Sequence, residues 1–390
     1  MLTRRATALS VALFVYGFGE ELWLRYVPEY LRALGASVFL VGLYGASKDF
    51  LDAAFAFPGG ALSDRIGTRR TLLSVGGLTT LGFAVYLLWP SPVGVFVGLP
   101  LVCAWASLGL PATFALIGEE LSGSRRVVGF TVQAVLKRLP IVLAPPLGGW
   151  LLERHGVRGG MRIGFAVSIV LSCAMLWWLA SRLRGEPDGK PLRRETAPAA
   201  TRLPRALRSL LLADCFIRLC EGLPEVFLVI WAIEVVRVTP VQFGILTSVL
   251  MATAIASYAP AAALAGRAEK KPFILATYAF FTLYPLAVLA SRSFAQLLLA
   301  YGLGGLREIG EPARKALIVD LAPPIARGRT VGLYYTVRGF AVAGAAALGG
   351  ALWTIRPSLT FLAAAGLGVV GTLWAALFLP ARPALRESGT

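Results

Sequence analysis

The chain has 390 residues, of which 57% are hydrophobic and only 15% are charged, and its mean hydropathy is +0.71. Soluble domains carry about 25% charged residues, so the composition excludes an ordinary soluble protein and indicates an all-α integral membrane protein. The net charge of +17 would suit a nucleic-acid ligand. Because the basic groups gather in loops between apolar segments, we expect a lipid bilayer and no nucleic acid as partner.

Apolar runs of about 20 residues recur along almost the whole chain, and each could cross a bilayer as a helix. We count twelve such runs. The first extends from Ala6 to about Val27. Its length and the acids Glu20 and Glu21 argue against a cleaved signal peptide, so we expect it to be the first transmembrane helix.

A stretch rich in Pro, Ala and Arg separates the sixth run from the seventh. It predicts a cytoplasmic linker, residues 183–208, between an N-terminal six-helix half, residues 1–182, and a C-terminal half, residues 209–390. Further basic clusters such as "DRIGTRR" and "GRAEKK" fall on the same side if twelve helices alternate. Loops rich in Lys and Arg stay in the cytoplasm, so we expect a multi-pass protein of the cell inner membrane with both termini cytoplasmic.

The two halves repeat one sequence pattern. The segment "GLPATFALIGE" from Gly109 aligns with "GEPARKALIVD" from Gly310, which sets Pro111 against Pro312 at an offset of 312 − 111 = 201. Because each half holds six helices, an even number, the halves have the same orientation. The chain is therefore predicted to be a parallel repeat about an axis along the membrane normal, as in two-half transporters.

Charge separates lipid-facing helices from helices that face water. A charge near the bilayer centre costs at least ~2.5–3.5 kcal/mol, so charged spans must face a cavity or each other. Spans without charges in their cores are expected to face lipid. These are the third, sixth, ninth and twelfth spans, near residues 71–90, 163–181, 272–291 and 357–380.

The loop after the second span, "GALSDRIGTRRTL" from Gly60, resembles the loop 2–3 signature of the major facilitator superfamily, with Thr68 as the one clear departure. A degenerate copy, "PAAALAGRAEKKP", occupies the equivalent loop of the second half. The resemblance implies the major facilitator fold, twelve transmembrane helices in two parallel-repeat halves, and a loop that closes the cytoplasmic side. The gating residues it implies are Gly60, Asp64, Arg65, Gly67, Arg69 and Arg70, the facing acids Glu119 and Glu120, and Arg267 with Asp320 in the second half.

A second stretch, "APPLGGW" from Ala144, is similar to an element in the fifth helix of the proton-coupled efflux antiporters of that family. Pro145, Gly148 and Gly149 fit the element, whereas Ala144 replaces a glycine. The arginine that those antiporters carry in the fourth helix is absent, with Trp105 near its place. The partial match favours efflux over uptake.

Acids inside the predicted spans are the candidates for proton coupling. A carboxyl group buried without a full partner has a raised pKa, which is what a proton carrier needs. The candidates are Glu20, Glu21, Asp49, Asp52, Glu221, Glu308 and Glu311. The structural alternative is static pairing, since Lys48 with Asp52, Arg307 with Glu311, and Glu311 with Lys315 stand four residues apart.

Cations inside the spans are the candidates for substrate binding: Lys137, Arg138, Arg307 and Arg338. Lys137 and Arg338 occupy equivalent places, since 338 − 137 = 201, and each lies about ten residues into a helix, near the expected midplane. Arg338 could grip a carboxylate or phosphate with two parallel hydrogen bonds. The alternative is a standing salt bridge to Glu20, Asp52, Glu221 or Glu308.

The sequence predicts no enzyme, no cofactor and no metal, because it lacks the nucleophile, zinc and phosphate-binding motifs. We expect a monomer that exchanges a small charged or amphiphilic solute for protons. Two alternatives stay open: a symporter or facilitator that takes up a charged metabolite, and a homologue that signals or scaffolds without transport.

Overall fold

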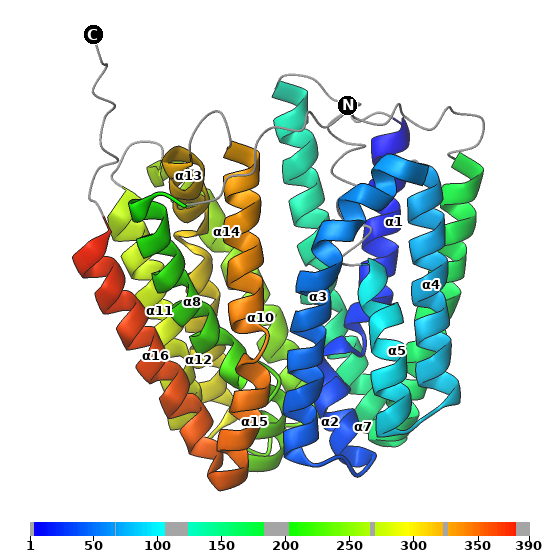
Figure 1. Ribbon diagram of the computed structural model, residues 1–390. Coiled ribbons are helices and arrows are strands. Elements are labelled where there is room, and N and C mark those ends of the chain that lie inside the picture. The colour runs from blue at the N-terminus through cyan, green and yellow to red at the C-terminus, as the bar shows by residue number, and fades with distance from the viewer. Residues whose placement is uncertain are drawn as a thin grey trace.

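The computed structural model describes residues 4–66, 68–105, 124–182, 203–265, 270–322 and 327–379, and these contain helices and no strand. Two bundles stand side by side, with the chain termini at one end (Figure 1). The first bundle contains α1 (Arg4–Glu21), η1 (Leu24–Tyr26), α2 (Val27–Ala33), α3 (Val38–Ile66), α4 (Thr68–Leu88), α5 (Pro92–Ala104) and α7 (Ser124–Arg182).

The second bundle follows the same order with more interruptions. It contains α8 (Arg205–Glu225), α9 (Leu228–Ile230), η3 (Trp231–Val235), α10 (Pro240–Ala265), α11 (Lys270–Ala290), α12 (Phe294–Gly305), η4 (Leu306–Glu308), α13 (Glu311–Leu321), α14 (Arg327–Val342), α15 (Ala345–Ile355) and α16 (Pro357–Phe378). Short breaks divide the first, seventh, tenth and eleventh predicted spans, where charged or small residues stand in the middle of the span.

The long helix α7 holds two spans. Gly156, at φ +72°, reverses the chain between them, a conformation that glycine adopts without steric penalty. Six described helices are apolar and long enough to cross a membrane: residues 69–88, 138–181, 240–257, 270–290, 330–355 and 357–378. Because α7 contributes two spans, these six helices account for seven spans, and α1, α3, α5, α8 and α12 lie at the remaining five of the predicted twelve-helix fold in two halves.

Close contacts between a glycine and the backbone of another helix occur at equivalent positions of the two halves. A Cβ on Gly148 would lie 1.8 Å from the Leu22 carbonyl oxygen, and one on Gly349 would lie 2.1 Å from that of Leu223. Both partners obey the offset, since 349 − 148 = 201 and 223 − 22 = 201. The same close approach between a glycine and a helix backbone is thus built twice, which confirms the parallel repeat.

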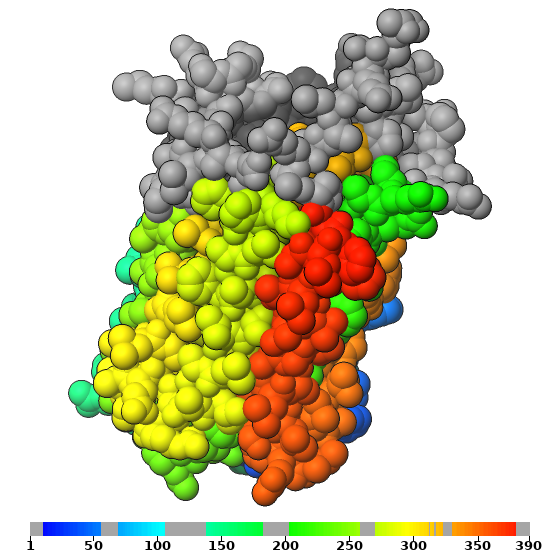
Figure 2. Space-filling view, turned by 90° about the vertical axis from the view of Figure 1, so that its left-hand side faces the viewer, coloured from blue at the N-terminus to red at the C-terminus, as the bar shows by residue number. Residues whose placement is uncertain are grey.

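The uncharged spans lie on the outside of the bundles, as predicted. Leu81 of α4 is 60% exposed, Trp177 of α7 is 72% exposed and Leu373 of α16 is 57% exposed. Figure 2 shows α16 running along the outer face of the second bundle, next to α11. Apolar side chains exposed over whole helices fit contact with lipid tails.

The halves meet along two seams that the repeat relates to each other. A Cβ on Gly244 of α10 would lie 2.5 Å from the carbonyl oxygen of Pro145 in α7. A Cβ on Gly42 of α3 would lie 2.6 Å from that of Ala346 in α15. Figure 1 shows α2 and α15 at the end of the molecule away from both termini. Near that end Arg32 of α2 pairs with Glu234 of η3 at 3.5 Å, so the halves are joined there.

Candidate functional site

A cavity of about 270 Å³ lies between the two halves. The first half contributes residues of η1, α2, α3 and α7, and the second half contributes residues of α8, α9, α10, α11, α12, η4 and α15. Both halves therefore line one cavity, as expected if the charged spans face water. It is the size of a small-molecule site, and it lies where transporters of this architecture bind their substrates.

Six charged side chains line the cavity, three basic and three acidic: Arg25, Lys48, Arg307, Asp49, Glu221 and Glu225. Each base has an acidic partner. Arg25 pairs with Glu21 at 3.0 Å, Lys48 pairs with Asp52 at 3.3 Å, and Arg307 lies 3.6 Å from Glu221. Asp49 and Glu225 differ, because neither forms a hydrogen bond or ion pair with another described residue. The charges without partners on this surface are therefore acidic.

Aromatic rings and Arg307 form the wall that the second half contributes. The Arg307 guanidinium carbon lies 4.8 Å from the ring centroids of both Phe281 and Tyr284. Its Nε donates to the Gly304 carbonyl at 2.7 Å. The rings hold the guanidinium in place by cation–π attraction, and most of its five N–H donors stay available.

Behind this wall the second half contains an ionic network. Arg218 donates to Glu221 at 2.5 Å and to Glu311 at 2.8 Å, and Arg314 donates to both oxygens of Glu311 at 2.7 and 2.8 Å. Arg314 also pairs with Asp214. The network thus runs from the cavity, at Glu221, into the interior of the half.

Asp214 is one of the acids that the sequence analysis missed. It is 1% exposed, and its carboxylate accepts hydrogen bonds from the hydroxyls of Tyr278 and Tyr334, both at 2.6 Å. Arg338 lies 3.7 Å from the same carboxylate. The available signal was an acid inside an apolar span, four residues before Arg218, which is the same signal that selected the other acids.

The predicted acids do not share one location. Asp49 and Glu221 line the cavity. Glu21 at the end of α1 pairs with Arg25 of η1, and Asp52 pairs with Lys48 within α3. Glu311 is 4% exposed within the network, and Glu308 pairs with Arg138 across the halves at 3.4 Å. Glu20 lies on α1 outside the lining. Glu225, which was not among the candidates, joins Asp49 on the cavity.

Among the predicted cations whose side chains the structure describes, only Arg307 lines the cavity. Arg138 is engaged with Glu308. Arg338 stands by Asp214, an acid outside the four partners considered for it, and stacks on Tyr335 with its guanidinium carbon 4.7 Å from the ring centroid. The side chain of Lys137 lies outside the described residues. Substrate contact by Lys137 and Arg338 stays a prediction.

One expected ion pair is wrong. Four residues separate Arg307 from Glu311, but Arg307 faces Glu221 of α8, whereas Glu311 pairs with Arg218, Arg314 and, at 3.8 Å, Lys315. The reason is a change of helix type: η4 ends at Glu308, and α13 begins at Glu311. The α-helical spacing that would bring the two side chains together is interrupted. The expected Lys48–Asp52 and Glu311–Lys315 pairs are present.

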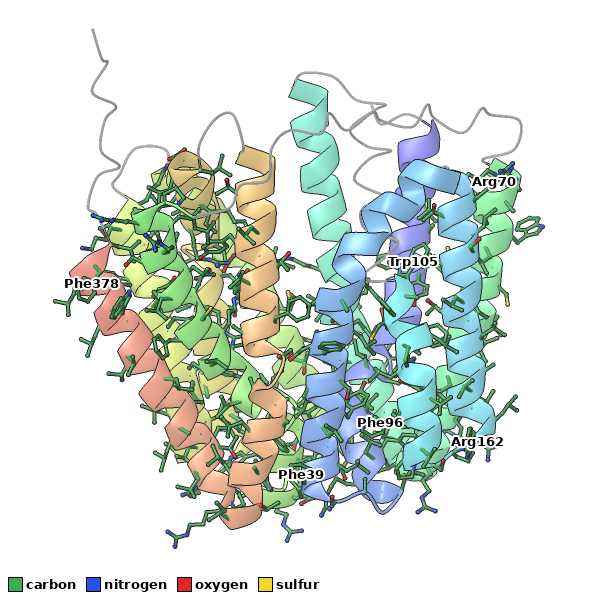
Figure 3. All side chains as sticks on the ribbon, viewed as in Figure 1. Phe39, Arg70, Phe96, Trp105, Arg162 and Phe378 are labelled. Atoms are coloured by element: carbon green, nitrogen blue, oxygen red, sulfur yellow. The ribbon has the colours of Figure 1, made fainter. Side chains whose placement is uncertain are left out.

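The structure describes only some of the residues of the loop signature and of the acids expected to face it. Gly67, Glu119, Glu120 and Arg267 lie outside the described residues, as do the side chains at positions 60, 64 and 65. Arg69 donates to the Ala180 carbonyl at 3.5 Å, and Arg70 lies at the end of the molecule that carries the N-terminus (Figure 3). In the second half Asp320 pairs with Lys270. In this loop the repeat offset is 202, since Arg65 aligns with Arg267, so the counterpart of Arg69 is Lys271. Lys271 donates to the carbonyls of Ala376 at 2.8 Å and Leu379 at 2.7 Å.

The antiporter-like element lies on a seam between the halves. A Cβ on Gly149 would lie 2.3 Å from the Pro240 carbonyl oxygen of the second half. The Tyr26 hydroxyl lies 2.7 Å from the Pro145 carbonyl oxygen and 2.9 Å from that of Pro240. Trp105, near the place of the missing arginine, is 5% exposed and packs on Tyr16 with ring centroids 4.7 Å apart. That position belongs to the aromatic core.

Within the described ranges no group of His, Cys, Asp and Glu has the arrangement of a metal site. The functional features are a charged cavity, two seams and an ionic network, all between membrane-length helices.

Known proteins with this arrangement are transporters. The family model of the Major Facilitator Superfamily matches residues 9–233 and 210–389. An uncharacterized MFS-type transporter of Methanocaldococcus jannaschii is 21% identical over 386 residues, which cover 95% of this chain and 94% of that protein.

Solved structures share the fold. A POT family transporter in complex with 5-aminolevulinic acid superposes with a TM-score of 0.77 at 15% identity, covering 96% of this chain and 95% of its own. A nucleoside transporter superposes with a TM-score of 0.77 at 12% identity, covering 97% of this chain and 100% of its own. The chain belongs to the Major Facilitator Superfamily and is a multi-pass membrane transporter of a small molecule, not an enzyme.

Proposed function

We propose that the protein is a proton-coupled antiporter that exports a small charged solute by alternating access. The observation that carries this proposal is the pair Asp49 and Glu225, which face one cavity from different halves without an ion-pair partner among the described residues. A carboxylate in that position can hold a proton or a positively charged group, but not both at once. Competition for one site is the physical basis of exchange.

The seams support the alternating part of the proposal. Close backbone contacts between the halves occur at Gly42, Gly149 and Gly244. Arg32 of α2, an element that Figure 1 shows at the end away from the termini, pairs across the halves with Glu234. With the termini in the cytoplasm, as the basic loops favour, this conformation is closed on the outside. The loop signature and its gating residues, which include Asp64, Arg65 and Arg70, would close the opposite side in the other conformation.

The proposed proton-binding groups are Asp49, one of the seven candidate acids, and Glu225, which was not among them. Glu221 and Glu311 are held by arginines at 2.5 to 2.8 Å, and a paired carboxylate is stabilised in its charged form. Asp49 and Glu225 form no such ion pair with a described residue. We therefore assign proton binding first to Asp49 and Glu225.

The test is gradient-driven transport by reconstituted protein. A thermal-shift screen against metabolites, drugs and lipids first selects a solute, because a ligand of the native state raises the apparent stability. In proteoliposomes loaded with that solute, an imposed proton gradient should drive its movement against the proton flow. Asp49→Asn and Glu225→Gln should abolish the gradient-driven component and spare exchange at equal pH.

Glu153→Gln is the matched control. The Glu153 Oε1 accepts a hydrogen bond from the Val241 backbone N–H at 2.9 Å, Glu153 is not part of the cavity lining, and glutamine keeps that acceptor. This variant should couple like the wild type. If both cavity variants still couple, the proton route lies elsewhere. Movement of the solute together with protons would instead favour the symport alternative.

A further inference from the structure

The second-half wall of the cavity carries hydroxyl groups that no described residue satisfies. Tyr284 and Tyr301 both line the cavity and are 3% and 2% exposed. Their hydroxyls have no hydrogen-bond partner of good geometry, and a bond between the two would still leave one O–H donor unused. Buried hydroxyls without partners are rare, because each costs about 1–3 kcal/mol.

Arg307 adds its own donors to this wall. The guanidinium lies over the Tyr284 ring, uses its Nε for the Gly304 carbonyl, and is 3.6 Å from Glu221. The planar group therefore presents donors next to the two phenols. Three side chains from three elements, α11, α12 and η4, supply O–H and N–H donors to one part of the cavity. Donors of this kind suit a carboxylate or another anionic oxygen group.

Acceptors stand elsewhere on the same cavity. Asp49 of α3 and Glu225 of α8 have no ion-pair partner among the described residues, and carboxylates are acceptor-only when ionised. The nearby bases Arg25 and Lys48 are already engaged with Glu21 and Asp52. A ligand group that satisfies Asp49 and Glu225 must donate hydrogen bonds and carry positive charge.

We infer that the transported solute is dipolar, with a cationic amine at one end and an anionic oxygen group at the other. The amine binds Asp49 and Glu225, and the anionic group binds Arg307 and the hydroxyls of Tyr284 and Tyr301. This inference rests on the proposed function for the role of the cavity, but it concerns binding and not the proton. A solute with only one of the two charges leaves one set of groups unsatisfied.

The experiment measures binding to the purified full-length protein at constant pH, without a membrane gradient. The probes are ω-amino acids of increasing chain length, together with n-alkylamines and alkanoates of the same lengths. Isothermal titration calorimetry should show one ω-amino acid binding at least about tenfold more tightly than either single-charge analogue, a difference of about 1.4 kcal/mol.

Variants assign the two ends. The double change Tyr284→Phe and Tyr301→Phe removes only hydroxyls. It should therefore weaken the binding of the amino acid about tenfold and leave the affinity for the alkylamine unchanged. Asp49→Asn should weaken the binding of both the amino acid and the alkylamine. Tyr86→Phe is the control, because the Tyr86 hydroxyl is also buried and without a partner but lies outside the cavity lining. It should change neither affinity.

Three outcomes overturn the inference: equal affinity for amine and amino acid, no binding of any amino acid in the series, or the same loss in the double variant as in Tyr86→Phe. Failure of the proposed function looks different. If amino acids bind as expected but proteoliposomes show no exchange with protons, the dipolar site stands and the antiport is wrong. If a simple cation is exchanged for protons and amino acids do not bind, the antiport stands and the dipolar site is wrong.

Discussion

The two halves share one fold but fill their interiors with different chemistry. In the first half Trp23, Tyr86 and Phe165 are fully buried and pack edge to face, with ring centroids 5.1 to 5.7 Å apart. The second half instead contains the ionic network of Asp214, Glu311, Arg314, Arg218 and Glu221. The repeat sets Leu13 against Asp214, since 214 − 201 = 13.

This difference separates a packing role from a switching role. Aromatic packing depends on area and shape and does not change with protonation. An ionic network is directional, and its members depend on each other's charge. Because Glu221 belongs to both the network and the cavity lining, a charged ligand that contacts it can alter pairing inside the second half. We therefore expect the second half to respond to the solute more than the first.

The largest effect is expected when the network loses its buried acid. Asp214→Asn leaves Arg314 and Arg338 facing a neutral group in a site that is almost closed to solvent. Removing one partner of a buried ion pair costs about 3–5 kcal/mol, so the melting temperature in detergent should fall steeply.

The first half supplies the control for Asp214. Leu13→Met at the equivalent position nearly conserves volume and should cost less than about 1.5 kcal/mol. Asp214→Glu, which keeps the charge, should retain more stability than Asp214→Asn. A melting temperature of Asp214→Asn equal to that of the wild type would mean that the network is dispensable.

A smaller effect is expected at the seams, where the halves touch. A Cβ on Gly244 would meet the Pro145 carbonyl oxygen at 2.5 Å, so Gly244→Ala should separate the halves at that end. We expect the equilibrium between the two conformations to shift at least about tenfold, or about 1.4 kcal/mol, toward the one in which this end is open. The shift is measured by cross-linking in a protein that carries Arg32→Cys and Glu234→Cys and has its four native cysteines replaced. A shift toward the open conformation appears as a loss of cross-linked product.

Gly77→Ala is the control for the seam. A Cβ on Gly77 has no heavy atom within 4 Å, so this change should leave cross-linking as it is. Gly42→Ala, the counterpart on the other seam, should act like Gly244→Ala. If Gly244→Ala cross-links as fully as Gly77→Ala, the seam does not report on the conformation.

The smallest effect is expected at the surface pair of Lys270 with Asp320, whose side chains are 27% and 41% exposed. Lys270→Gln should cost about 0–1 kcal/mol, and the loss should disappear near 1 M salt, where the screening length is about 3 Å. Melting temperatures of the wild type and Lys270→Gln at low and high salt measure both the loss of stability and its dependence on salt.

Arg69, which lies in the equivalent loop of the first half, extends this test to that half. If the loop signature binds an acid such as Glu119, as the family resemblance implies, Arg69→Gln should show the same salt-dependent loss. A loss that salt does not change would point to the Ala180 carbonyl, 3.5 Å from Arg69, as the partner that matters. The halves would then differ at this end as well.

Much of the fold could be predicted because the bilayer imposes strict rules. Length and apolarity select spans, and an offset of 201 relates the halves both in the sequence and in the contacts of Gly148 and Gly349. Pairs four residues apart on an uninterrupted helix, such as Lys48 with Asp52, could also be predicted. The Arg307–Glu311 pair could not, because the helix changes type between them.

The sequence by itself determined the membrane class, the two six-helix halves, the lipid-facing helices and the set of charged residues available for function. These depend on local composition and spacing, which the chain carries in one dimension. Only the tertiary structure decided which charges meet. Arg338 stands by Asp214, Arg307 stands by Glu221 and two tyrosines, and Asp49 faces the same cavity as Glu225. These partners come from helices far apart in the chain, and their pairing depends on helix rotation and on breaks such as η4, which sequence spacing does not encode.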